Sequence, residues 1–123
     1  MTSSARRVAP LALTLALACT TAQAQDAAAG GMAFMQCADC HSPGAGDGVG
    51  PGLKGLVGRR AGAKPGFLYS PAMAQSTLVW TAAELDAFLA DPKKAMPGTT
   101  MAYPGNVDAK ERADLVAYLA TLR

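Results

Sequence analysis

Apolar residues recur at helical spacing within residues 81–92, TAAELDAFLADP. Thr81 followed three residues later by Glu84 forms a capping box, which is typical of a helix start. The residue before a proline is disfavoured in a helix, so this helix is predicted to end before Pro92. One face of it would carry Leu85, Phe88 and Leu89. The segment therefore predicts an amphipathic helix with a buried apolar face.

The end of the chain has the same pattern over residues 108–123. Asp108 with Glu111 three residues later indicates a helix start. The apolar stripe that follows consists of Leu115, Tyr118, Leu119 and Leu122. The alanine-rich residues 26–40 predict a third helix, and residues 70–76 a short fourth one. No segment shows the alternation of a strand, so we expect an all-α fold with three main helices.

Glycine and proline dominate the chain between the helices. Nine of the 13 glycines fall within residues 42–69. A structureless connection of this length is uncommon inside a small domain. Large apolar side chains are also few for a domain of this size, and such small chains often need a further stabilising element. We infer that the glycine-rich loops wrap a bound group that completes the core.

The N-terminal residues have the features of a secretory signal peptide. Arg6 and Arg7 precede an apolar run of about a dozen residues, which is too short to span a bilayer, since spanning takes ~20. Ala22 and Ala24 mark a small-residue cleavage site. Residues 1–24 are therefore predicted to be cleaved, leaving one domain at 25–123 without a membrane span, located in the periplasm.

Loss of the signal peptide also changes the charge. The full chain has 11 basic and nine acidic residues. The two arginines are removed with the signal, and the mature net charge is then near zero. A basic face is the mark of a nucleic-acid-binding domain, so we expect no nucleic-acid partner.

Residues 37–41, CADCH, hold both mature cysteines and the one histidine of the chain. A thioredoxin-like dithiol needs a strand–helix context, which the pattern lacks. A zinc site needs four ligands, and the mature chain has no further cysteine or histidine. A disulfide across two residues would close too short a loop to stabilise much. Cys-x-x-Cys-His is also the signature of covalent c-type haem attachment, and this interpretation remains after the others are eliminated.

The iron of such a haem has a second axial position, which a methionine or a lysine could fill or which could stay open. The mature methionines are Met32, Met35, Met73, Met96 and Met101. Met32 and Met35 lie too close to the cysteines in sequence to reach the opposite haem face. Met96 and Met101 share the Pro/Gly-rich segment MPGTTMAYPG, which is extended enough to bring a side chain to the iron. These local arguments favour Met101 only slightly over Met96.

Several segments together resemble the class I cytochrome c family, over about residues 26–122. They occur in family order around the haem motif. The segments are GMAF, GPGLKGLVGRRAG, FLYSPAM, LVWTAAELDAFLADPKKAMPGTTMAY and ERADLVAYLATL. The resemblance implies the cytochrome c fold, with helices and Gly/Pro-rich loops wrapped around one haem c.

The resemblance also implies roles for individual residues. Cys37 and Cys40 would hold the haem, and His41 would be the proximal iron ligand. In the family motif Pro-Gly-Thr-x-Met the methionine is the distal ligand, which selects Met101 and leaves Met96 to packing.

Other positions of the family pattern have supporting roles. The Pro51 carbonyl would bond the second nitrogen of His41 and fix the ring. Positions near the haem propionates are matched by Arg59, Tyr69, Ser70, Trp80 and Thr99. Gly30 and Phe34 would cross the last helix near Leu115 and Tyr118, and Arg112 would be structural.

The sequence departs from the family at positions that bear on the distal side. Phe88 stands where mitochondrial members have a tyrosine near the distal sulfur, and Met73 replaces an asparagine of the internal polar network. Several lysines of the docking surface are missing. Lys93 and Lys94 are either exposed charges before a loop or part of what remains of that surface. The departures leave the redox potential and the partners open.

The resemblance implies an electron-transfer protein and not an enzyme. We expect a periplasmic monomer that carries one electron between redox proteins of a respiratory chain or a periplasmic dehydrogenase, through small transient contacts. Three alternatives remain. The first is a cytochrome subunit of a larger dehydrogenase. The second is a haem protein whose distal methionine is displaced in ligand sensing or catalysis. The third is a thiol–disulfide oxidoreductase.

Overall fold

The computed structural model describes Met1 and residues 24–123, and in this part of the chain the secondary structure is helical. The helices are α1 (Ala27–Ala33), the 3-10 turn η1 (Phe34–Gln36), α2 (Pro71–Ala74), α3 (Ala82–Ala90), α4 (Pro92–Ala95) and α5 (Ala109–Leu119). One isolated bridge, between Arg60 and Val79, is the only β-type pairing found in the described residues. The predicted all-α class is therefore confirmed. The predicted signal peptide lies outside the described residues, apart from its two ends.

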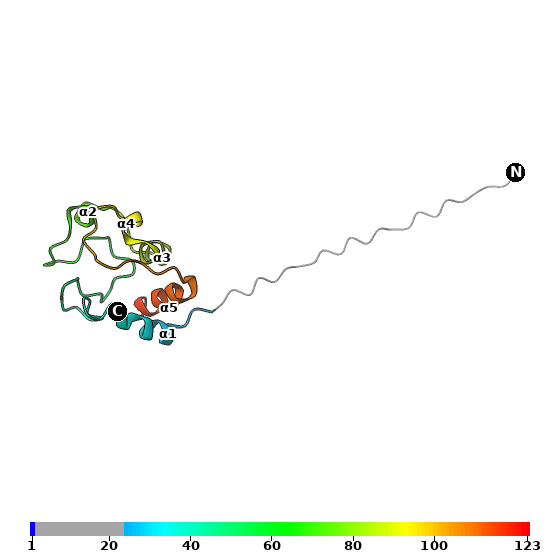
Figure 1. Cartoon of the computed structure of the whole chain (residues 1–123), viewed down its shortest axis with the longest axis horizontal. Coiled ribbons are helices and arrows are strands. Elements are labelled where there is room, and N and C mark those ends of the chain that lie inside the picture. The colour runs from blue at the N-terminus through cyan, green and yellow to red at the C-terminus, as the bar shows by residue number, and fades with distance from the viewer. Residues whose placement is uncertain (2–23) are drawn as a thin grey trace.

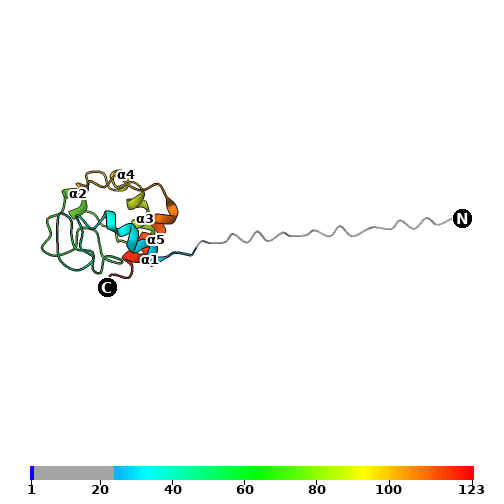
Figure 2. The ribbon, with the colours of Figure 1, turned by 60° about the horizontal axis from the view of Figure 1, so that its bottom comes forward.

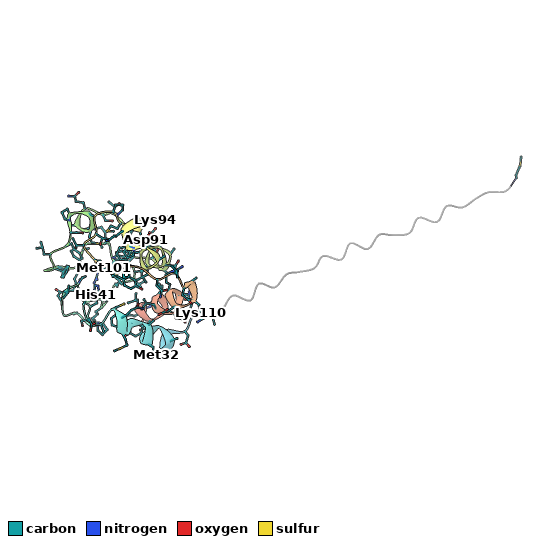
Figure 3. All side chains as sticks on the ribbon, in the orientation of Figure 1. Met32, His41, Asp91, Lys94, Met101 and Lys110 are labelled. Carbon is teal, nitrogen blue, oxygen red and sulfur yellow. The ribbon has the colours of Figure 1, made fainter. Side chains whose placement is uncertain are left out.

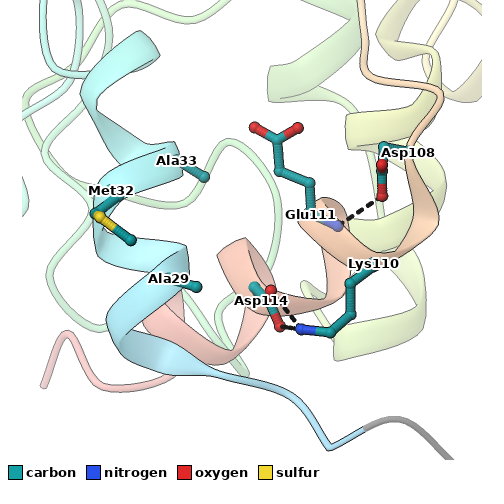
Figure 4. Close-up of a pocket in the computed structure, with 7 residues that line it drawn as sticks. All are labelled: Ala29, Met32, Ala33, Asp108, Lys110, Glu111 and Asp114. Atoms are coloured by element: carbon teal, nitrogen blue, oxygen red, sulfur yellow. Dashed lines mark hydrogen bonds and ion pairs between the residues drawn. The ribbon is translucent and has the colours of Figure 1, made fainter.

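The helix starts are capped by the side chains that the sequence indicates. The Thr81 hydroxyl accepts from the Glu84 amide at 3.2 Å, and Asp108 Oδ1 accepts from the Glu111 amide at 2.9 Å (Figure 4). The short helix near residues 70–76 is present as α2, with Ser70 as its N-cap. Each cap satisfies an amide that has no partner inside the helix.

Two elements differ from the expectation. The alanine-rich N-terminal segment is α-helical only to Ala33 and then tightens into η1, which ends just before the first cysteine. The residues after α3 form a further short helix, α4, in which Pro92 occupies the first turn and Asp91 caps the Lys94 amide at 3.1 Å. Proline is well tolerated in a first turn, so it ends one helix and starts the next.

Helices α1 and α5 cross in direct contact, as Figures 1 and 2 both show. The crossing is centred on Gly30, where a Cβ atom would lie 2.5 Å from the Asp114 carbonyl carbon and 2.8 Å from Tyr118 Cβ. Beside it, the Phe34 and Tyr118 rings pack with centroids 5.2 Å apart. The expected crossing of these helices is confirmed, and it needs a residue without a side chain at position 30.

The glycine-rich loop is fastened to the rest of the molecule by backbone and charged contacts. The Leu53 amide donates to the Ser42 carbonyl at 2.9 Å, and the Gly55 amide to the Leu122 carbonyl at 2.5 Å. Asp47 accepts from the Gly52 amide at 2.8 Å and pairs with Lys64 at 2.7 Å. The Lys64 ammonium and this amide hold the pKa of Asp47 below its ordinary value. These contacts give the loop a defined path.

None of the described helices is both long enough and apolar enough to cross a membrane.

Candidate haem site

The loops and helices α3 and α5 enclose a cavity of about 490 Å³. Its wall is mostly apolar and includes core side chains such as Leu53, Leu85, Phe88 and Leu115. Cys37, Cys40, His41 and Met101 also line it. His41 and Met101 lie next to each other in the view of Figure 3, and both belong to the wall of this one cavity.

The haem motif begins where η1 ends. The His41 amide donates to the Cys37 carbonyl at 2.9 Å, and the Cys40 amide donates to the same carbonyl at 3.1 Å. This turn brings both sulfur atoms and the imidazole to one wall of the cavity. Both thiols are free, with Cys37 half-buried and Cys40 exposed.

The thiols lack the environment of a redox dithiol. Burial raises the pKa of Cys37, and the neighbouring Cys40 raises it further. A thiol–disulfide oxidoreductase needs a lowered thiol pKa, because the thiolate is the nucleophile. The site thus argues against one of the three alternatives.

The imidazole of His41 is held by the chain from one side. Its Nδ1 lies 2.8 Å from the Pro51 carbonyl oxygen. A carbonyl only accepts, so Nδ1 carries the proton and Nε2 has a free lone pair. Gly50 covers the ring closely, since a Cβ there would lie 2.7 Å from both ring nitrogens. The chain therefore orients His41 with Nε2 available to a metal.

Among the described residues, two methionines line the cavity, Met73 and Met101. Met96 does not line it. Met96 is only 7% exposed and belongs to the core. Met101 follows the turn at Gly98, whose φ is +90°, and its amide donates to the Thr99 hydroxyl at 3.4 Å. Met73, one of the five methionines that the sequence offers and the one expected in the internal polar network, is the second methionine of the wall.

The five residues expected near the propionates all line the cavity, and several also bond the chain. Arg59 donates through Nη1 to the Lys54 carbonyl at 3.0 Å. The Ser70 hydroxyl accepts from the Met73 amide at 3.2 Å as the cap of α2. The Trp80 ring packs edge-on against Phe88 with centroids 5.1 Å apart. The structure brings these residues to one site, where Arg59 and Ser70 also hold the loop and α2.

Sequence reasoning missed other parts of the wall. Phe67 packs edge-on against Tyr69 at 4.8 Å, and Arg60 donates to the Ser76 carbonyl at 2.8 Å while lining the cavity. Phe67 was within a segment that carries the family resemblance. Arg60 had no signal, because two adjacent arginines in a loop usually remain solvated.

The donor set and the wall fit a covalently attached haem. Two free thiols stand at the spacing of the attachment motif, beside an imidazole with a free Nε2 and a half-buried thioether, and the apolar wall would exclude water. The fold and the site thus define an all-α protein that binds one covalently attached haem.

The comparisons with known proteins agree. The family model for Cytochrome c matches residues 27–123. The chain is 41% identical over 117 residues to cytochrome c2 of Rhodomicrobium vannielii, covering 94% of each chain. It is 51% identical over 80 residues to cytochrome c of Trypanosoma brucei brucei, covering 65% of this chain and 86% of that one. Among solved structures, cytochrome cH from Methylobacterium extorquens is 49% identical with a TM-score of 0.75, covering 78% of this chain and 98% of that one.

The chain belongs to the cytochrome c family. It is a class I cytochrome c that binds one haem c covalently through Cys37 and Cys40. Members of this group are electron-transfer proteins and not enzymes.

Proposed function

We propose that the protein is an exported one-electron carrier whose haem iron is held by His41 and Met101. The observation that carries the proposal is that one apolar cavity is lined by an imidazole with a free Nε2 and by the thioether of Met101. Two strong axial ligands leave no position for a substrate, so the site would only change its charge by one electron.

Each residue of the site has a separate task in this proposal. Cys37 and Cys40 fix the group to the loop, and Pro51 keeps His41 in one tautomer and one orientation. Met101 supplies a soft sulfur donor from a loop that is far from the attachment motif in sequence. The haem supplies a reversible one-electron iron couple, whose potential a thioether ligand and burial raise. Side chains such as Leu115 keep water from the cavity.

The polar residues of the wall would meet the propionate end of the group. Arg59 offers a guanidinium whose N–H groups can donate to a carboxylate. Tyr69, Ser70, Trp80 and Thr99 offer hydroxyl and indole donors along the same wall. Together they would compensate two carboxylates inside a mostly apolar site, where an unpaired charge is expensive.

Export follows from residues 1–24, which we propose to be a cleaved signal peptide, with the mature domain at 25–123 in the periplasm. Cytochromes c2 among the relatives support this location. We propose a monomer that exchanges electrons transiently with donor and acceptor redox proteins of a respiratory chain or a periplasmic dehydrogenase. The alternative is that the protein is a bound cytochrome subunit of such a dehydrogenase.

A displaceable Met101 is the second candidate, and one observation favours it. Phe88 lines the distal wall and has no hydroxyl to offer the sulfur atom. Distal hydrogen bonding influences whether a haem site transfers electrons or binds small molecules. Carbon monoxide binding to the reduced wild-type protein distinguishes the two candidates.

The test compares Met101→Ala with Met73→Ala and Met96→Ala in the haem-loaded protein. Met101→Ala should lose the long-wavelength ferric charge-transfer band of sulfur-ligated haem and bind carbon monoxide rapidly when reduced. Met96→Ala should keep the band and lose about 2–5 kcal/mol of stability, as a truncated core side chain does. Met73→Ala should also keep the band.

Three results would contradict the proposal. The first is survival of the band in Met101→Ala. The second is loss of the band in Met73→Ala. The third is a wild-type protein that lacks the band and binds carbon monoxide rapidly. The first two would reassign the ligand, and the third would favour the displaceable-methionine candidate.

A further inference from the structure

The exposed residues around the two cysteines form a rim that is nearly free of charge. We define the cysteine rim as the exposed side chains of the cavity wall on this side: Gln36, Asp39, Val49, Thr100, Ala102 and Pro104. The rim is continuous. The Gly50 amide donates to the Cys40 carbonyl at 2.8 Å, which places Val49 beside the motif. The Tyr103 hydroxyl donates to Gln36 at 3.4 Å, which places residues 100–104 beside η1.

Most cations of the described domain lie outside the cavity wall or are already paired. Lys64, Lys110 and Arg112 each pair with a carboxylate, at 2.7, 2.6 and 2.8 Å. Lys93 and Lys94 are on α4 and do not line the cavity, and Figure 3 shows where Lys94 lies. Arg60 is the one exposed cation of the described wall, and its guanidinium donates to Ser76 beside α2. Asp39 is therefore the single charge of the cysteine rim.

From this charge distribution we infer that the cysteine rim is the docking face for a redox partner whose own face is neutral and apolar at its centre. The inference rests on the proposed electron-carrier function. Val49 is 80% exposed and, with Ala102 and Pro104, offers apolar contact on the same rim of the cavity as the attachment motif. Charged residues are depleted at the centre of protein interfaces, and electron-transfer contacts are small and transient. An acidic partner face would find no lysine here to pair with.

The first test measures salt dependence with a small anionic oxidant. One electron passes from the reduced protein to hexacyanoferrate(III), which becomes hexacyanoferrate(II). Between about 10 and 150 mM salt we expect the bimolecular rate constant to change by less than about fivefold, because steering by a charged patch changes rates by about 10–10³-fold. A tenfold or larger change in either direction overturns the inference. If the loaded protein exchanges no electron, the proposed function itself fails.

A pair of variants locates the contact. Val49→Lys adds a cation to the rim, and Val107→Lys adds the same charge at a valine that is 96% exposed and outside the cavity wall. At low salt Val49→Lys should raise the rate with hexacyanoferrate(III) about fivefold, from the attraction of unlike charges at short range. Val107→Lys should raise it less than twofold. Equal effects of the two variants would show that electrons leave elsewhere.

A binding measurement checks the same point without electron transfer. Hexacyanochromate(III) is paramagnetic and redox-inert under these conditions, so it broadens amide resonances where it binds. The wild-type protein should show no broadening at the amides of the cysteine rim. Val49→Lys should show it at residue 49 and at Cys40, beside which Val49 lies, and Val107→Lys should not. Broadening of the rim in the wild-type protein would reveal a basic docking face and overturn the inference.

Discussion

Replacement of Gly30 by alanine tests the crossing of α1 and α5 that supports the whole domain. The added Cβ would overlap the Asp114 carbonyl oxygen and lie 2.5 Å from its carbon and 2.8 Å from Tyr118 Cβ. Carbon atoms pack best about 3.5–4.0 Å apart, so the two helices must separate by about 1 Å. The obstacle is backbone and a Cβ atom, neither of which can rotate away.

The magnitude combines an unfavourable and a favourable contribution. Overpacking of a well-filled contact costs about 1–3 kcal/mol, and a rigid obstacle belongs at the upper end. Alanine also has a higher helix propensity than glycine, by about 1 kcal/mol. We therefore expect Gly30→Ala to lower the free energy of unfolding by about 2 kcal/mol. For a domain of this size that lowers Tm by about 8–16 °C.

Gly31 provides the matched control, because it lies in the same helix. A Cβ at Gly31 would meet only the Tyr118 ring, at 3.4 Å. Gly31→Ala should gain the helix propensity without the overlap and stabilise the protein by about 0.5–1 kcal/mol. The assay is guanidinium unfolding of the haem-loaded protein, followed by far-UV circular dichroism with the m-value checked for constancy. Equal midpoints for the two alanine variants would refute the steric argument.

Three further changes should alter stability in graded ways. Leu115→Ala, at a side chain 2% exposed that faces the cavity, should cost about 2–5 kcal/mol in the same unfolding assay. Thr81→Ala should cost about 1 kcal/mol, because the Glu84 amide loses its cap, and Thr81→Ser should restore most of it. Asp114 has a pKa held below its ordinary value of 3.8 by the Lys110 ammonium and then by the Asp26 amide. The ionised Asp114 therefore stabilises the fold above pH 3.8, and this stabilisation is lost as the pH falls through the lower folded-state pKa. In acid unfolding, the free energy of unfolding of Asp114→Asn should depend less steeply on pH than that of the wild type. An identical pH dependence would contradict this assignment.

The helices that the sequence predicted well are those with both an apolar stripe and a cap. Residues 81–92 and 108–123 had both signals, and α3 and α5 start at the expected caps. Helix α4 was not predicted, because a four-residue helix is too short to show a periodic pattern. Its two lysines are equally compatible with a loop. The change from α-helix to 3-10 turn at Phe34 has no sequence signal either, since it depends on how the chain enters the haem motif.

The candidate site, like the fold, could be predicted from the sequence only in part. The attachment motif was identified from local spacing, because thiols and an imidazole within five residues permit few chemistries. The methionine expected at the second axial position could not be chosen in this way, because Met96 and Met101 share one loop and differ only in where the folded loop points them. The family resemblance favoured Met101, and the structure places it in the cavity and Met96 in the core. Met73 entered the wall through α2, which the spacing of methionines does not reveal.

The core and the cavity wall of this protein are largely the same residues. Phe34, Leu53, Trp80, Phe88 and Leu115 all belong to the buried cluster, and all of them also line the cavity. These side chains pack on one another on one side, and on the other side they would pack on the haem. A group that binds the folded state and not the unfolded chain stabilises the fold by its binding free energy. The few large apolar residues of the sequence are thus sufficient only together with the group they enclose, and substitutions in the wall must change haem contact and folding stability at the same time.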